Sequence, residues 1–183
     1  MVRWVPGVMY MNAIFLGLAL VLLDVDLTIG TATIELLPDF LGFFLILKGM
    51  TGLAGENKFF DLGRHMAFGL ALVYFVLFIA AVMNPGTVGK VIFWCVGLAA
   101  LIGQLALMKK IVAGVRQMEL DSQRDLKGER IQAMWLILVV LSPLSHLLSW
   151  VPIVGGICGI AEMLVGILFL VAFRECVKLH KAK

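Results

Sequence analysis

The chain has 183 residues, 62% of them hydrophobic, and its mean hydropathy is +1.04. Soluble domains contain about 45–50% apolar residues, and a soluble chain of this length could not bury so much apolar surface in one core. The net charge is +3, but no cluster of basic residues with interleaved aromatics is present, which argues against nucleic-acid binding. The composition therefore predicts an integral membrane protein.

Six apolar segments fill most of the chain, with short polar stretches between them. A run of about 18–25 apolar residues spans a hydrocarbon layer about 30 Å thick, and a helix satisfies its own backbone hydrogen bonds in lipid. We therefore expect an all-α fold: an integral membrane bundle of six transmembrane helices in a single domain covering residues 1–183. The predicted helices cover about 7–27, 36–55, 62–83, 87–117, 131–150 and 152–177.

The basic residues are distributed unevenly among the polar stretches. The two termini, the second loop and the fourth loop hold 13 of the 15 lysines and arginines, whereas the other loops hold only Lys90, and Lys48 lies within the second segment. Loops rich in lysine and arginine remain in the cytoplasm. We therefore expect a multi-pass protein of the bacterial cytoplasmic (plasma) membrane with both termini in the cytoplasm.

The longest polar stretch is the charged loop at about 118–130. Just before it, Ile111, Val115 and Met118 recur at helical spacing among charged residues, which predicts an amphipathic continuation of the fourth helix into the cytoplasm. Gly128 marks the expected break in this helix. The loop is either a solvated connection that also sets topology or a docking surface for a cytoplasmic partner.

The second, fourth and sixth segments open with the same spacing of proline and glycine. The three copies are Pro38 and Gly42, Pro85 and Gly89, and Pro152 and Gly156. Proline suits the first turn of a helix, and a glycine one turn later lets a neighbouring helix approach closely. The pattern predicts three pseudo-repeated helical hairpins, unless it only reflects how common these residues are where membrane helices begin.

Two ionisable residues fall inside predicted membrane segments. Lys48 lies ten residues after Pro38, and Glu162 lies ten residues after Pro152, so each is expected about 15 Å below the outer boundary. Charged side chains are costly at this depth and are candidates for function. We expect Lys48 and Glu162 to form an interhelical ion pair, which either fixes helix register or takes part in substrate binding or proton coupling. Alternatively, Lys48 extends to the cytoplasmic interface.

A second polar group is predicted at the outer face. Asp24 and Asp26 end the first segment, Glu35 closes the first loop, Asp39 follows a helix-starting proline, and His146 lies near the outer end of the fifth segment. Carboxylates and imidazole could bind a cationic solute or a divalent metal. Alternatively, Asp39 complements the helix dipole, the other carboxylates face solvent, and His146 is a hydrogen-bonded packing residue.

Signatures of known catalysts and cofactor sites are missing from the sequence. No nucleophile elbow, metalloprotease, P-loop or dinucleotide motif occurs, although an intramembrane aspartyl dyad formed by Asp24 and Asp39 is geometrically conceivable. The three cysteines lack the spacing of a disulfide framework or a metal site. We expect no enzyme, no bound cofactor and no structural metal.

The stretch at 36–49, with Leu37, Pro38, Asp39, Phe40 and Gly42, resembles a segment of small bacterial multi-pass proteins. In these proteins an L-P-D-F-x-G motif opens an apolar helix, and the resemblance implies no particular activity. Length and helix count are also similar to those of the S components of energy-coupling-factor transporters. That likeness implies a membrane subunit that captures a vitamin or a metal for an importer.

Taken together, these observations predict a membrane protein that binds or transports a small solute. We expect Asp24, Asp39, His146 and Glu162 to contact the solute, with Lys48 as counter-ion. The competing prediction is a non-transporting interaction protein, such as an assembly, immunity or regulatory subunit. Such a protein would dock through the fourth and sixth segments and the loop at 118–130.

Overall fold

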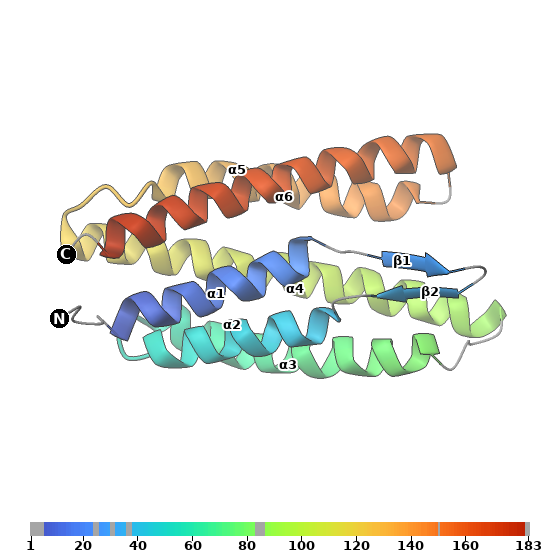
Figure 1. Ribbon diagram of the computed structural model, residues 1–183, viewed down its shortest axis with the longest axis horizontal. Coiled ribbons are helices and arrows are strands. Elements are labelled where there is room, and N and C mark those ends of the chain that lie inside the picture. The colour runs from blue at the N-terminus through green and yellow to red at the C-terminus, as the bar shows by residue number, and fades with distance from the viewer. Residues whose placement is uncertain are drawn as a thin grey trace.

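The computed structural model describes residues 6–23, 26–29, 32–35, 38–82, 87–149 and 151–181. These residues form six helices and one short β-hairpin (Figure 1). The helices are α1 (Pro6–Leu22), α2 (Asp39–Leu53), α3 (Lys58–Val82), α4 (Thr87–Ser122), α5 (Gly128–Leu148) and α6 (Pro152–Lys181). Strands β1 (Asp26–Ile29) and β2 (Ala32–Glu35) pair antiparallel between α1 and α2.

The helices run up and down along one axis as three helical hairpins: α1 with α2, α3 with α4, and α5 with α6 (Figure 1). The start of α1, the turn at 54–57, the connection at 123–127 and the end of α6 lie at one end of the bundle, here named the terminal end. The β-hairpin and the α5–α6 connection lie toward the opposite end, named the distal end. The pseudo-repetition of these hairpins that the sequence suggests stays a prediction.

Neighbouring helices close the bundle into a ring. Each helix packs against the next one in the chain, and α6 packs against α1. Among the described residues, no helix packs against a helix across the ring. Because α1 lies between α2 and α6 in this order, these two helices do not pack against each other.

Four of the helices are long and apolar enough to cross a membrane, and a shorter apolar helix covers Gly7–Leu22. These four spans lie in α3, α4, α5 and α6. The all-helical bundle predicted from composition is thereby confirmed in its main features. Helix α2, with 15 residues, is about 22 Å long, so it is shorter than the hydrocarbon layer.

Several helix ends differ from the predicted ones. The first helix, predicted to reach residue 27, ends at Leu22, and residues 26–29 form a strand instead. Each strand contains two adjacent β-branched residues, Thr28-Ile29 and Thr33-Ile34, and such residues favour extended backbone. The predicted continuation of the fourth helix is confirmed, because α4 extends to Ser122.

An asparagine fixes the start of α3. The side-chain oxygen of Asn57 accepts hydrogen bonds from the backbone nitrogens of Phe59 and Phe60, at 3.0 and 3.2 Å, as an N-cap residue does. Its amide nitrogen donates to the carbonyl oxygen of Gly114 at 3.2 Å. The same side chain therefore caps α3 and ties it to α4.

The hydrophobic core lies in the terminal half of the ring. Buried apolar side chains occur along the whole of α1 and α2, but on α3 none is buried beyond Ala71, and on α4 none before Ala100, among the side chains described. On α6 the buried apolar side chains begin at Phe169. Because α1 and α2 reach only part of the way along the bundle (Figure 1), the distal half lacks the side chains that fill the terminal half.

Candidate functional site

A cavity of about 550 Å³ lies inside the ring, and residues from all six helices line it. Leu22 from the end of α1 and Asp39 from the start of α2 both belong to its wall. The cavity therefore occupies the level at which these two short helices stop and the core ends. Its volume falls within the range of about 300–1,000 Å³ that is typical of small-molecule sites.

Glu162, on α6, is the ionisable residue placed deepest along a membrane-length helix in this wall. It lies ten residues after Pro152, hence about 15 Å from the start of the helix, and its side chain is half-buried. Among the residues that the structure describes, none forms a hydrogen bond or ion pair with it. A carboxylate at such a position is costly, which makes it a candidate for function.

Asp39 brings a second carboxylate to the cavity as the first residue of α2. Its half-buried side chain stands at the helix N-terminus, where the helix dipole favours negative charge. Phe40 lies beside it and packs against Phe75 and Phe78 of α3, with ring centroids 5.2 and 5.6 Å apart. These contacts hold the start of α2, and hence Asp39, against α3.

His146 of α5 also lines the cavity and is held by α4. Its ring stacks on Trp94, with centroids 5.1 Å apart and planes 25° from parallel. Its Nε2 lies 3.4 Å from the carbonyl oxygen of Trp94, and because that oxygen can only accept, Nε2 is the donor. One face of the imidazole thus packs on Trp94 and one nitrogen forms a hydrogen bond. This agrees with the alternative that His146 is a hydrogen-bonded packing residue.

The remaining polar groups of the cavity come from hydroxyl and amide side chains. The Tyr74 hydroxyl of α3 donates to Gln104 Oε1 of α4 at 2.9 Å. Ser142 of α5 is 4% exposed, and Ser145 and Ser149 lie one and two turns further along. Sequence reasoning missed Tyr74, although a tyrosine within an apolar segment is itself a signal, since its hydroxyl needs a partner.

The other residues predicted for the site do not join the cavity. Lys48 is exposed on α2 and is absent from the cavity wall, and Asp24 lies outside the described residues. Asp26 and Glu35 occupy paired positions at the base of the β-hairpin. Three of the five predicted site residues, Asp39, His146 and Glu162, therefore converge on one cavity.

The predicted ion pair between Lys48 and Glu162 is wrong: it is not among the ion pairs of the described residues, and α2 does not pack against α6. Two physical reasons account for the error. Equal distance from a helix start says nothing about which neighbour a side chain faces, and α1 stands between the two helices. In addition, α2 starts closer to the middle of the bundle than α6 does (Figure 1), so the two depths differ.

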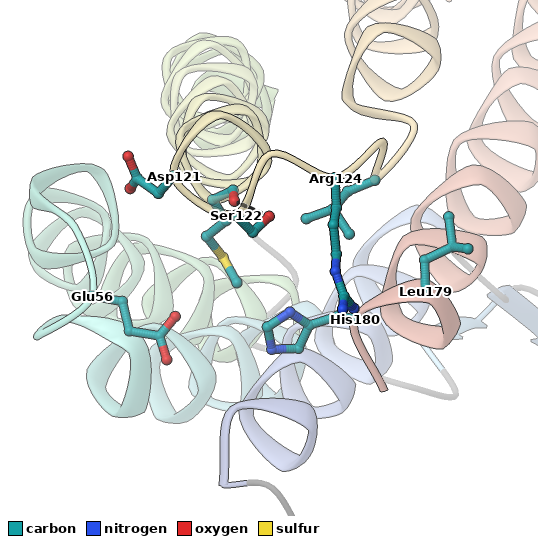
Figure 2. A pocket seen from close by; sticks show the side chains of 8 residues that line it. Glu56, Asp121, Ser122, Arg124, Leu179 and His180 are labelled. Carbon is teal, nitrogen blue, oxygen red and sulfur yellow. Dashed lines mark hydrogen bonds between the residues drawn. The ribbon is translucent and has the colours of Figure 1, made fainter. Parts of the chain in front are cut away.

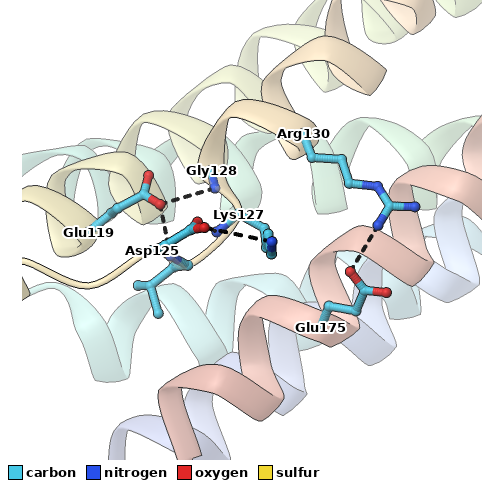
Figure 3. A network of polar contacts seen from close by, with 7 residues as sticks. Glu119, Asp125, Lys127, Gly128, Arg130 and Glu175 are labelled. Carbon is cyan, nitrogen blue, oxygen red and sulfur yellow. Dashed lines mark hydrogen bonds and ion pairs between the residues drawn. The ribbon is translucent and has the colours of Figure 1, made fainter.

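The predicted charged loop is a short, ordered connection (Figure 3). Glu119 Oε1 accepts hydrogen bonds from the backbone nitrogens of Leu126, at 2.7 Å, and Gly128, at 3.5 Å. The backbone N–H of Lys127, 2.8 Å from Asp125 Oδ1, lowers the pKa of that carboxyl. Arg130 then joins α5 to Glu175 of α6 at 3.0 Å. Docking of a cytoplasmic partner at this loop stays a prediction.

A second, smaller cavity of about 340 Å³ opens at the terminal end. Figure 2 shows side chains from the α2–α3 turn, α4, the α4–α5 connection and α6 around it, among them Glu56, Asp121, Arg124 and His180. His180, in the last turn of α6, is only 8% exposed. Acidic and basic groups are both present, so this cavity has no marked preference for one sign of charge.

Neither cavity is a recognisable metal centre. Among the described residues, no group of three or more histidine, cysteine, aspartate and glutamate side chains is arranged to hold a metal ion. The three cysteines are free. The polar groups of the larger cavity are instead spread over several helices, among apolar side chains.

Comparison with known proteins adds no further assignment. No family model, no curated protein and no solved structure matches the chain. The function must therefore be inferred from the cavity and the charge distribution.

Proposed function

We propose that this protein binds a small solute within the membrane, in the larger cavity, and serves in solute transport as a membrane-embedded binding subunit. The observation that carries the proposal is Glu162: a half-buried carboxylate on a membrane-length helix, without a protein partner in the described part of the chain, at the wall of a ligand-sized cavity. Asp39 and His146 reach the same cavity from two other helices. Ligand sites between the helices of a bundle typically combine apolar side chains with a few polar groups from different helices.

The charge distribution supports an orientation for the proposal. Lysine and arginine residues of the described chain gather toward the terminal end, on the turn at 54–57 and its flanks, at the 123–127 connection and on the last turns of α6. By the positive-inside rule, the terminal end faces the cytoplasm of a bacterial cell. The cavity then lies in the outer half of the membrane, where an incoming solute would first meet it.

The test is solute-dependent stabilisation of the purified full-length protein in detergent. A set of small amines, carboxylates, sugars and divalent salts is screened by thermal unfolding of the wild-type protein. We expect at least one solute to raise Tm, and we expect Glu162→Gln to abolish that increase while leaving the Tm of the ligand-free protein within a few degrees of wild type. In this proposal Glu162 contacts the solute and no other part of the described chain, so folding should tolerate the neutral glutamine side chain.

Glu175→Gln is the matched control, because it makes the same change on the same helix outside the cavity, at an exposed side chain. It should retain the full increase in Tm. If no solute stabilises the wild-type protein and a second protein co-purifies with it instead, the solute-binding proposal is wrong. The chain would then be better described as a non-transporting interaction protein.

A further inference from the structure

We propose that α4 and α5 together bind the headgroup of an anionic phospholipid at a basic patch made of Lys109, Arg116, Gln132 and Trp135. This patch is separate from the larger cavity, and it does not depend on which solute the cavity takes. Lys109 directly follows the stretch at 91–108, which contains no charged residue and is about 27 Å long as a helix. Its ammonium group therefore stands at the level where the hydrocarbon layer meets the lipid headgroups.

The neighbouring helix holds Lys109 in place through an aromatic ring. The exposed Lys109 side chain has its Nζ 5.8 Å from the centroid of the Trp135 ring of α5. The indole nitrogen of Trp135 donates to the carbonyl oxygen of Leu105 at 3.0 Å, which fixes the ring against α4. Tryptophan is common at the level of the headgroups, because its ring combines an apolar body with a polar N–H. The ring thus positions the ammonium group where lipid phosphates lie.

A second cation lies further along the same face of α4. Arg116 follows Lys109 by seven residues, which places it about 10 Å along the helix axis on the same side. It donates a hydrogen bond to Gln132 Oε1 and forms an ion pair with Glu129 at 3.7 Å. The Glu129 side chain is 89% exposed, and an ion pair in water contributes little. A guanidinium has five N–H donors, so Arg116 keeps donors for a phosphate.

The charge of Lys109 is not balanced by a carboxylate in the described chain. Lys109 takes part in none of the ion pairs among the described side chains. The acidic residues whose side chains are not described are Asp24, Asp26 and Glu35. All three belong to the stretch between α1 and α2, and neither of these helices packs against α4 or α5 in the described chain. A negatively charged headgroup therefore supplies the complementary charge at Lys109.

The same face of α4 becomes apolar toward the middle of the membrane. Ile102 precedes Lys109 by seven residues, and its side chain is 59% exposed. Positions 102, 109 and 116 therefore follow one line along the helix, apolar at one end and basic at the other. An acyl chain beside Ile102 and a phosphate beside Lys109 match this line, whereas a soluble phosphate would use only its basic part. Basic groups between membrane helices bind anionic lipid headgroups in this way.

The experiment titrates the purified full-length protein, in a non-ionic detergent, with one of three probes. These are dioleoyl phosphatidylglycerol, dioleoyl phosphatidylcholine and the soluble glycerol 1-phosphate. Native mass spectrometry counts the bound lipids, and thermal unfolding gives Tm. We expect phosphatidylglycerol alone to bind saturably and to raise Tm. Lys109→Gln should weaken this binding about fivefold, which is the contribution of one lysine near an anionic surface.

Lys58→Gln is the matched control for Lys109→Gln. Lys58 is also exposed, lies over an aromatic ring, that of Phe59 at 5.6 Å, and takes part in no ion pair among the described side chains. It belongs to α3 and lies outside the basic patch, so Lys58→Gln should bind phosphatidylglycerol as wild type does. Arg116→Gln removes the other cation of the patch and should also weaken binding. This second variant keeps the proposal testable if Lys109→Gln does not fold.

Three results would overturn the lipid site. Equal binding of phosphatidylcholine would show that the charge of the headgroup is not recognised. An equal loss of affinity in Lys58→Gln and in the two patch variants would show a general attraction that is not centred on the basic patch. Stabilisation by glycerol 1-phosphate as strong as that by the lipid would mean that a soluble phosphate binds there. Glu162→Gln should bind phosphatidylglycerol normally, so failure of the lipid site leaves the proposed function standing, and the reverse also holds.

Discussion

At the scale of single residues, three glycines determine how closely α1 and α2 pack. A Cβ added to Gly17 would lie 2.5 Å from the carbonyl oxygen of Gly42, and one added to Gly49 would lie 2.6 Å from the carbonyl oxygen of Tyr10. Backbone atoms of this kind cannot rotate away as a side chain can. Small residues at helix contacts allow such close approach in membrane proteins, and here they join the two short helices.

Gly42 and Gly156 occupy the same place in two copies of the proline–glycine pattern, and they should respond differently to substitution. Gly42→Val should lower the free energy of unfolding by about 1–3 kcal/mol, because a Cβ there meets Val21 Cγ2 at 2.6 Å and Gly17 O at 2.8 Å. Gly156→Val should change it by less than about 0.5 kcal/mol, because no atom of the described residues lies within 4 Å of a Cβ added there. Reversible unfolding in mixed detergent measures both values, and equal losses would contradict this account.

The same pattern shows how far sequence reasoning reaches for a single residue. The prediction that proline marks a helix start is confirmed at two positions, since Pro152 begins α6 and Pro38 directly precedes α2. Pro85 lies outside the described residues. The expectation of a close helix contact is confirmed at Gly42 and wrong at Gly156. A proline constrains its own backbone, whereas the contact of a glycine depends on where the neighbouring helix lies.

At the scale of the elements, the connection between α4 and α5 depends on one carboxylate. Glu119 accepts from the backbone of Leu126, whose side chain is 3% exposed, so the acceptor holds a buried apolar residue in place. Arg130 and Glu175, by contrast, form an ion pair in which the two side chains are 48% and 43% exposed. Exposed pairs of this kind contribute little to stability.

We predict that Glu119→Ala lowers the free energy of unfolding by about 1–3 kcal/mol, because a partly buried N–H loses its acceptor. Glu119→Gln keeps one acceptor oxygen and should lose less. Arg130→Ala is the comparison and should cost about 0–1 kcal/mol. Chemical unfolding of the three variants in detergent provides the values. A larger loss for Arg130→Ala than for Glu119→Ala would show that the exposed ion pair, and not the loop contact, holds this end together.

The presence of the helices is predictable from the sequence, because the length of an apolar run is a local property. The residues at which the helices end are harder to predict. The continuation of α4 followed from the helical spacing of Ile111, Val115 and Met118, all of which are buried. The strand at 26–29 was missed because its apolar residues continue the first apolar run and mask the change from helical to extended backbone. Hydropathy alone does not distinguish these two states.

At the scale of the whole molecule, the cavity follows from unequal helix lengths. Helices α1 and α2 fill the ring only in the terminal half, so the distal half of α3–α6 surrounds a polar space. The sequence identified Asp39, His146 and Glu162 because ionisable residues in apolar segments are conspicuous. It could not show that Lys48 faces outward or that Tyr74 faces inward, because orientation around a helix axis depends on the order of helices in the ring.

The last prediction concerns how the ring sits in the membrane. Single cysteines are introduced as Gly55→Cys, Gln123→Cys and Ser149→Cys in a chain whose Cys95, Cys158 and Cys176 are replaced by serine or alanine; all three new sites are exposed. A membrane-impermeant maleimide applied to intact bacterial cells should label only the Ser149→Cys variant. The other two variants should react only after permeabilisation, because the proposed orientation places the basic terminal end in the cytoplasm. Different accessibility at positions 55 and 123 would mean that α3 and α4 do not form a hairpin that crosses the membrane twice, and the orientation proposed for the cavity would then be wrong.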